Sequence, residues 1–424
     1  MSTVIEGKTG NGAAVLVWCG VLHAFTHSFH VVLMPLYLAI QQDLGLASVA
    51  ETTLLMTALM MAYFLPSYHL GVVADRYDRR WLLGGGLVCN GIGFVALGLA
   101  PSYGWALLAV VVAGFGGGCY HPAATSLIAQ SYPNEQGKAF GLVGIGANVG
   151  FLFVPAYAGW RLDRGVLEQG VAAWRWPVVE LGGLAIMVAL VFLVATRHWQ
   201  VSRRSQDSHH AEAPLFGSRK RWLLFIGAAV ALSLRDFAGM GMGSLGALFL
   251  PQAHGYNSAA TGLALSAIFL AAIISNPLFG RLSDRHRYGW MTFVMTTAGL
   301  VVFAFPFLPA WGLVPGLMTY GFFFMAGYPM VEAALMESIP AAVRGRVFGL
   351  FILISGCLGN LSHWVIGRWV GTLGTQAVEV EAYRAPYLGL ALLIWGSMIG
   401  LVCLWVLRSE QRKELLARAE RLGR

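Results

Sequence analysis

His23, His27 and His30 stand close together within the first apolar run of the chain. At about 100° per residue, an α-helix places these three side chains within about 60° of one another, on a single face. Imidazole accepts and releases protons near neutral pH, so this face could carry a coupling proton or contact a solute. A lone histidine in an apolar helix is usually a structural hydrogen-bond donor, but three on one face favour a place in a cavity.

Charged side chains also occur inside later apolar runs, where each costs several kcal/mol unless it is paired or reaches water. We expect Arg235 to bind an anionic group of a solute, and Asp236 or Glu332 to carry a proton. Adjacent residues of a helix do not face each other, so we expect Arg235 and Asp236 not to neutralise one another directly. The alternative is a structural ion pair with another helix.

His121 precedes Pro122 in the fourth apolar run, after three consecutive glycines. Proline removes a backbone hydrogen bond and kinks a helix. The kink either serves packing alone or forms a hinge that points His121 inward as a further solute contact. Glu337, near the end of the tenth run, either shares the role of Glu332 or joins the charged residues that follow it, such as Arg344.

The composition identifies the class of protein that positions these residues. Of 424 residues 57% are hydrophobic and 11% charged, and the mean hydropathy is +0.66. A soluble domain has roughly a quarter charged residues, so a polytopic membrane protein is expected. The net charge of +8 comes from residues in short gaps between apolar runs, so we expect no nucleic-acid partner. The five cysteines show no paired spacing, and we expect neither disulfides nor a metal site.

Twelve apolar runs are long enough to cross a bilayer as helices. Most of the 28 Lys and Arg residues lie at the N-terminus, in every second gap and at the C-terminus. Because cytoplasmic loops carry the positive charge, the chain is expected in the cell inner (cytoplasmic) membrane with both termini on the cytoplasmic side. The runs are 13–40, 48–70, 81–100, 104–130, 138–160, 177–196, 222–250, 258–279, 290–309, 311–337, 346–370 and 385–407.

The two halves of the chain repeat. The stretch GVVADRYDRRW at 71–81 returns as GRLSDRHRYGW at 280–290, and Pro122 returns as Pro329. Features in the same order at a nearly constant offset indicate duplication of six helices in parallel orientation. We therefore predict an all-α membrane protein of two six-helix bundles. The predicted parts are a bundle at 1–196, a cytoplasmic linker at 197–221, a bundle at 222–407 and a cytoplasmic tail at 408–424.

The repeated loop, with its Gly-x-x-x-Asp-Arg pattern, resembles the signature loop of the major facilitator superfamily. His23, FGGGCYHPAATSLIA at 115–129 and GIGANVG at 144–150 resemble the fosmidomycin-resistance group of bacterial exporters within it. The resemblance implies a secondary transporter with two further sets of residues. The loop residues Asp75, Arg76 and Arg80, with Asp284 and Arg285 in the second copy, would form a cytoplasmic latch. The glycine-rich pattern of exporters in the fifth helix would comprise Gly141, Gly150, Pro155 and Gly159.

These observations predict a proton-coupled antiporter that exports a small anionic or amphiphilic drug or metabolite by alternating access. The expected partners are a small-molecule substrate, protons and the lipid bilayer, and the chain is expected to be a monomer without enzyme activity or cofactor. Two alternatives remain open: a proton-coupled uptake symporter for a small organic anion, and a membrane receptor or scaffold that transports nothing. A membrane enzyme is disfavoured, because the histidines do not form the several converging boxes of a di-iron site.

Overall fold

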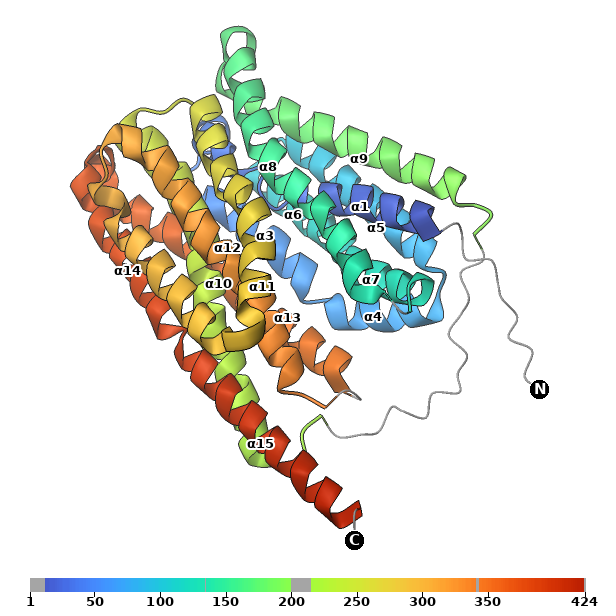
Figure 1. Ribbon diagram of the computed structural model, residues 1–424. Coiled ribbons are helices and arrows are strands. Elements are labelled where there is room, and N and C mark those ends of the chain that lie inside the picture. The colour runs from blue at the N-terminus through green and yellow to red at the C-terminus, as the bar shows by residue number, and fades with distance from the viewer. Residues whose placement is uncertain (1–11, 134, 200–214, 341–342, 423–424) are drawn as a thin grey trace. The chain divides into compact units, whose positions relative to one another are not determined.

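The computed structural model describes residues 12–133, 135–199, 215–340 and 343–422, and within these ranges every regular element is a helix (Figure 1). The chain forms two compact units. Unit 1 comprises residues 1–206 and 255–266, and unit 2 comprises residues 207–254 and 267–424. Most of the predicted linker at 197–221 lies outside the described residues.

The helices of unit 1 begin and end where the sequence supplies signals for it. Ser48 and Glu51 form a reciprocal capping box at the start of α3, and Asp78 caps α5 by accepting from the Arg80 amide. The fourth crossing is broken at Cys119, shortly before Pro122. The elements are α1 (Gly12–Ser28), η1 (Met34–Leu36), α2 (Tyr37–Asp43), α3 (Val49–Phe64), α4 (Ser67–Arg76), α5 (Arg79–Gly98), α6 (Tyr103–Gly118), α7 (Tyr120–Ser131), α8 (Gln136–Gln169), η2 (Gly170–Trp174) and α9 (Arg175–Ala195).

Unit 2 repeats this succession with longer continuous helices. The long helix α11 contains two predicted crossings, which a non-helical residue, His286, separates at φ −135° and ψ 57°. The first residues of α11 belong to unit 1. The elements are α10 (Arg219–His254), α11 (Ser258–Ala304), η4 (Phe305–Phe307), η5 (Ala310–Gly312), α12 (Leu313–Glu337), α13 (Arg344–Leu373), η7 (Gly374–Val378), η8 (Val380–Tyr383), α14 (Arg384–Gly396) and α15 (Ile399–Leu422).

Eight helical stretches of the described residues are long and apolar enough to cross a membrane, and α1 adds a shorter apolar helix. Two of the eight, at 138–195 and 258–307, each contain two of the predicted crossings. Each of the twelve predicted runs lies mainly on described helix, and the first, 13–40, is interrupted by a turn at 29–33. The predicted fold class is therefore confirmed for the part of the chain that the structure describes.

Small residues allow the helices within each unit to pack closely. A Cβ atom at Gly150 of α8 would collide with the Ala24 carbonyl of α1, and one at Gly359 of α13 would lie 3.0 Å from Asp236 Cβ of α10. A Cβ at Gly91 of α5 would lie 2.6 Å from the Gly182 carbonyl of α9. The first crossing of each unit, α1 or α10, thus packs on the fifth crossing, α8 or α13.

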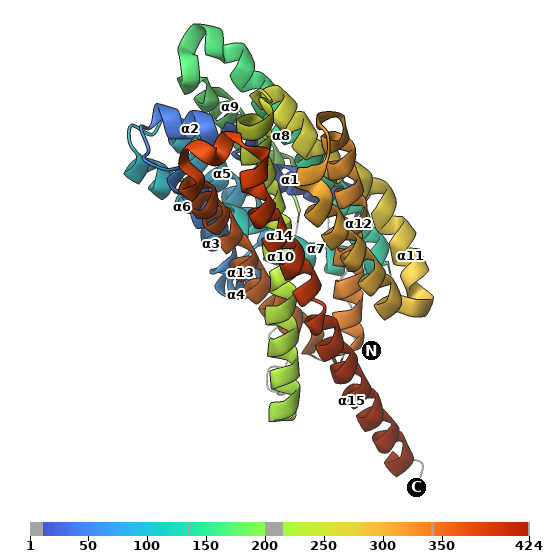
Figure 2. The ribbon, with the colours of Figure 1, turned by 90° about the vertical axis from the view of Figure 1, so that its left-hand side faces the viewer.

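The predicted tail at 408–424 continues the last helix of unit 2 as far as Leu422. Helix α15 runs from Ile399 to Leu422 without interruption, because no glycine or proline occurs after Gly400 in that range. Lys220, near the start of α10, forms an ion pair with Glu410 of α15 at 3.2 Å. Figure 2 shows both helices continuing past the rest of unit 2 on the same side of it.

Candidate functional site

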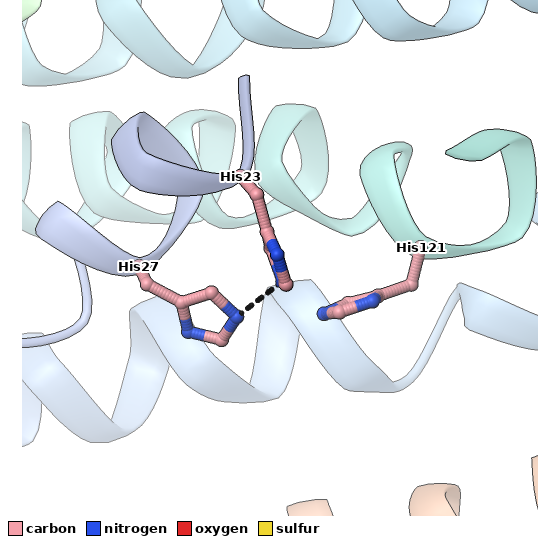
Figure 3. Close-up of side chains that lie close together, drawn as sticks. All are labelled: His23, His27 and His121. Carbon is pink, nitrogen blue, oxygen red and sulfur yellow. Dashed lines mark hydrogen bonds between the residues drawn. The ribbon is translucent and has the colours of Figure 1, made fainter. Parts of the chain in front are cut away.

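The histidines predicted in the first apolar run meet His121 in unit 1 (Figure 3). His23 and His27 extend from α1, and their Nε2 atoms lie 2.9 Å apart. His121 extends from α7, and each of the three residues offers a ring nitrogen within 4.8 Å of the others. The ring centroid of His121 lies 5.3 Å from that of His23 and 5.7 Å from that of His27. Two helices therefore bring three imidazoles into one group, called the histidine cluster below.

The ring of His23 is held from two sides. Its Nδ1 lies 3.0 Å from the Val143 carbonyl of α8. Its face stacks on Tyr120 at 4.8 Å, and the Tyr120 hydroxyl donates to the Cys19 carbonyl at 2.7 Å. A carbonyl only accepts hydrogen bonds, so Nδ1 carries the hydrogen and the neutral ring keeps a lone pair on Nε2. His27 Nε2 is then the donor of the contact between the two rings.

His30 extends the histidine cluster from a turn instead of from the helix. Helix α1 ends at Ser28, and the His30 amide donates to the His27 carbonyl at 3.1 Å. The His30 ring lies edge-on to His27 at 4.8 Å and to Tyr63 at the same distance. The expected single helical face therefore holds for the first two histidines, and the third remains their neighbour by another route.

Arg235 and Asp236 form an ion pair in unit 2, which corrects the expectation that adjacent helical residues do not neutralise one another. Arg235 Nη2 and Nε lie 2.6 Å and 3.0 Å from Asp236 Oδ1. The guanidinium carries its charge on a long flexible stem, which folds back along α10 to the next residue. Both side chains are buried, Arg235 almost completely.

The Arg235–Asp236 pair also reaches α12. The Arg235 guanidinium lies 4.2 Å from the ring centroid of Tyr328, a distance at which a cation is attracted to an aromatic face. Its Nη1 donates to the Gly327 carbonyl at 3.4 Å. Glu332, one turn after Tyr328, is exposed and lies within electrostatic range of the pair. Unit 2 thus places one guanidinium and two carboxylates on its first and fourth crossings.

The charged loop of unit 1 is anchored by one of the expected residues, Arg80, and by Arg79, which was not expected. Arg80 pairs with Asp78 at 2.5 Å and donates to the Thr196 carbonyl at 2.6 Å. Arg79 is buried and donates to Gln130 at 2.8 Å. Arg76 is exposed, and the side chain of Asp75 lies outside what the structure describes. Sequence analysis missed Arg79, although the buried Leu83 and Leu87 share its face of α5 and indicate its burial.

The charged loop of unit 2 centres on Glu337. Arg287 and Arg408 lie 2.9 Å and 3.1 Å from the Glu337 carboxylate. Asp284 is exposed and lies 3.7 Å from Arg287, and Arg285 is also exposed. Glu337 therefore joins the charged residues at the helix ends, and the two expected residues of this loop lie at its edge.

The glycine-rich stretch of α8 lies against two helices within unit 1. A Cβ at Gly150 or at Gly159 would collide with backbone carbonyls, of Ala24 and of Ser258 respectively, and Gly262 packs on the Pro155 carbonyl. Gly141 has open space around it. Close backbone approach thus explains two of the four predicted positions, Gly150 and Gly159.

Two polar networks escaped sequence analysis. His363 of α13 is fully buried and bonds to Ser244 of α10 at 2.7 Å and to Asn360 at 3.2 Å. Glu180, to which no role was assigned, accepts hydrogen bonds from Tyr157 and Arg161. Both networks depend on partners far away in the chain, so local pattern gave no signal for them.

Comparison with known proteins identifies the family. The family model of the Major Facilitator Superfamily matches residues 16–363 and 237–422. The fosmidomycin resistance protein of Escherichia coli (strain K12) is 21% identical over 374 residues, 87% of this chain and 89% of that protein. The class G tetracycline resistance protein of Vibrio anguillarum is 25% identical over 385 residues, 83% of this chain and 85% of that protein.

Among solved structures, the chain resembles a bacterial homolog of the human lysosomal transporter Spinster in its inward-facing, unoccupied conformation. The TM-score is 0.74 at 19% identity, and the match covers 94% of this chain and 97% of the other. The nucleoside transporter NupG matches with a TM-score of 0.69 at 14% identity, over 93% of this chain and 99% of the other. The chain belongs to the Major Facilitator Superfamily of membrane transporters.

Proposed function

We propose that this transporter is a proton-coupled antiporter that exports a small anionic or amphiphilic drug or metabolite by alternating access. It would act in the cytoplasmic membrane as a monomer with both termini inside. The observation that carries the proposal is the buried Arg235–Asp236 pair with the exposed Glu332 beside it. The names of the relatives, resistance proteins and efflux pumps, support export.

Antiport requires that solute and proton compete for one group. Glu332 suits this role, because a proton removes the negative charge with which its exposed carboxylate would hold a charged hydrogen-bond donor of the solute. Arg235 stays charged and can hold an acidic group of the same solute through two hydrogen bonds. An amphiphilic solute with both kinds of group would therefore be released when Glu332 takes up a proton.

The symport alternative follows from Asp236. A purely anionic solute that binds Arg235 must displace the Asp236 carboxylate from Nη2 and Nε. The displaced carboxylate is left buried without a counter-charge, and a proton taken up with the solute would neutralise it. Solute and proton would bind together, as uptake by symport requires. The sign of the pH effect on solute affinity thus separates the two mechanisms.

The charged loops would hold the cytoplasmic side closed in one state. We propose that the latch runs through Arg80 and Thr196 in unit 1 and through Arg287 and Glu337 in unit 2. Asp75, Arg76, Asp284 and Arg285, which the family resemblance suggests, would contribute to it in other conformations. The packing of Gly150, Pro155 and Gly159 would keep α8 close to its neighbours, as in the exporters that carry this pattern.

The test is electrophysiology on a solid-supported membrane, with a panel of solutes and an imposed pH gradient. For the antiporter, solute affinity falls as the pH is lowered, and Glu332→Gln abolishes proton-driven transport while counterflow remains measurable. Glu381→Gln is the matched control, because Glu381 is exposed in the same unit and pairs with Arg384 outside the site. Affinity that rises at low pH would establish symport, and absence of any flux would leave only a receptor or scaffold.

A further inference from the structure

We propose that His23, His27 and His121 bind a first-row transition-metal cation that prefers nitrogen ligands, for which Zn²⁺ is the probe. Sequence analysis led us to expect no metal, because the cysteines show no paired spacing. The fold brings the three rings together (Figure 3). The proposal concerns the residues assigned above to solute binding, but binding of the cation does not depend on the direction or coupling of transport.

The distances suit a metal after small rotations of the side chains. With Zn–N bonds of about 2.0–2.1 Å, tetrahedral coordination sets ligand nitrogens about 3.3 Å apart. The Nε2 atoms of His23 and His27 lie 2.9 Å apart, and the ring nitrogens of all three residues lie within 4.8 Å. The first two rings must separate by a few tenths of an ångström and His121 must approach them, without movement of either helix.

His23 already has the environment of a metal ligand. Histidines that bind metals usually donate their second ring N–H to a carbonyl or carboxylate, which fixes the tautomer and orients the ring. His23 Nδ1 lies at hydrogen-bonding distance from the Val143 carbonyl, and its Nε2 lone pair points into the histidine cluster. The stacked Tyr120 ring limits rotation further.

His27 must change its tautomer to bind the cation. Its Nε2 donates to His23 without a metal, so the ring hydrogen moves to Nδ1 when Nε2 becomes a ligand. Nδ1 is buried and makes no hydrogen bond within the part of the chain that the structure describes. This cost is present in either tautomer, and a cation at Nε2 replaces a weak contact between two neutral imidazoles with a stronger bond.

The donor set selects the class of cation. Three imidazoles suit Zn²⁺, Cu²⁺ or Ni²⁺, whereas Ca²⁺ and Mg²⁺ require oxygen ligands. Three protein ligands leave one position of a tetrahedral site open. A donor atom of a solute could occupy that position, so a metal complex would be a suitable cargo or inhibitor of the transporter.

The experiment measures metal binding without solute or gradient, on the full-length protein purified in detergent through a tag that contains no histidine. His209→Asn and His210→Asn remove the adjacent linker histidines from the background. We titrate Zn²⁺ against a chromophoric chelator and expect one ion per chain. His121→Ala should weaken binding at least about tenfold, whereas His69→Ala, at an exposed position of α4, should not.

A spectroscopic readout separates ligation from a structural role. Co²⁺ in place of Zn²⁺ should give the visible bands of a four-coordinate site, and His121→Cys should add a sulfur-to-cobalt charge-transfer band. This variant also decides the question if His121→Ala does not fold. Absence of one-to-one binding to the parent protein would overturn the proposal. So would an affinity in the His23→Ala, His27→Ala and His121→Ala variants equal to that of the parent protein. Either result leaves proton-coupled transport to be judged by its own assay.

Discussion

The histidine cluster of unit 1 and the Arg235–Asp236 pair of unit 2 occupy corresponding places in their units. The histidine cluster lies on the first and fourth crossings of unit 1, α1 and α7. The pair lies on the first crossing of unit 2, α10, and contacts Tyr328 on the fourth, α12. In the sequence His27 precedes Arg235 by 208 positions and His121 precedes Tyr328 by 207, close to the offset of the repeated loops. Duplication has preserved the positions of the side chains that meet and changed their chemistry.

The two units differ in whether the charge of these side chains depends on protons. Unit 1 presents imidazoles, whose charge depends on protons and whose lone pairs can bind metals. Unit 2 presents a guanidinium that is always charged, balanced by carboxylates. A buried permanent charge requires its partner, whereas a neutral ring can lose a contact at modest cost. Variants at the corresponding positions should therefore differ in size of effect.

The largest loss in the free energy of unfolding is expected for a substitution of Arg235. Arg235→Ala leaves Asp236 buried without its cation, and such a loss typically lowers the free energy of unfolding by about 3–5 kcal/mol. His27→Ala, at the corresponding position, should cost about 1–2 kcal/mol, because it removes only neutral contacts. Thermal or denaturant unfolding in detergent measures both. Equal losses would contradict the distinction between permanent and proton-dependent charge.

The double variant Arg235→Met with Asp236→Leu provides the control for that comparison. It removes both charges together and should recover most of the stability lost in Arg235→Ala, since no uncompensated ion remains. Neither Arg235→Ala nor the double variant should transport, because neither keeps a cation that holds the solute. A double variant as unstable as the single one would show that packing around the stem of Arg235, and not its charge, determines stability.

A substitution of Arg79 should give the next largest loss in the free energy of unfolding. Arg79→Ala removes a buried hydrogen bond of a charged donor to Gln130, and we expect a loss of about 2 kcal/mol in the free energy of unfolding. Arg76→Ala, three residues earlier and exposed, should change it by no more than about 0.5 kcal/mol. Similar losses in both variants would mean that the loop of unit 1 acts through its net charge alone.

The crossings could be predicted from sequence because their signal is local. Apolar runs, loop charge and the repeated motifs each depend on residues near one another, and they located all twelve runs on helices. The shared helical face brought His23 and His27 together for the same reason. The place of His121 beside them depends on how α7 packs against α1. The sequence suggested only that a hinge at Pro122 could point His121 inward.

The details of the sites depend on features that are not local. The Arg235–Asp236 pair depends on the rotamer of a long side chain, and the rule for adjacent helical residues fails when the stem folds back. The burial of Arg79 depends on Gln130 of α7, and that of His363 on Ser244 of α10. Periodicity could have indicated that Arg79 lies on a buried face, but it could not have named its partner.

Variants of His23 measure how much the stability of the histidine cluster depends on the hydrogen bond to Val143 and the contact to His27. His23→Ala removes the bond to the Val143 carbonyl and the contact to His27, and we expect a loss of about 1 kcal/mol. His23→Asn, which keeps a donor near Val143, should recover part of it. Unfolding curves of the two variants compared with the parent give the measurement. A loss as large as that of Arg235→Ala would indicate that the cluster is as dependent on its partners as the ion pair.

The smallest effect is expected at Asp284, which the family resemblance places in the latch and the structure places at its edge. Its carboxylate is 73% exposed and lies 3.7 Å from Arg287, three residues later and beyond the non-helical His286. Exposed pairs of this kind contribute about 0–1 kcal/mol, so Asp284→Asn should leave the unfolding curve almost unchanged. Arg287→Ala, which also breaks the contact to Glu337 at 2.9 Å, should cost more and serves as the comparison. If Asp284→Asn slows transport several-fold without loss of stability, Asp284 must contact a partner in another conformation, and the latch of unit 2 extends beyond Arg287 and Glu337.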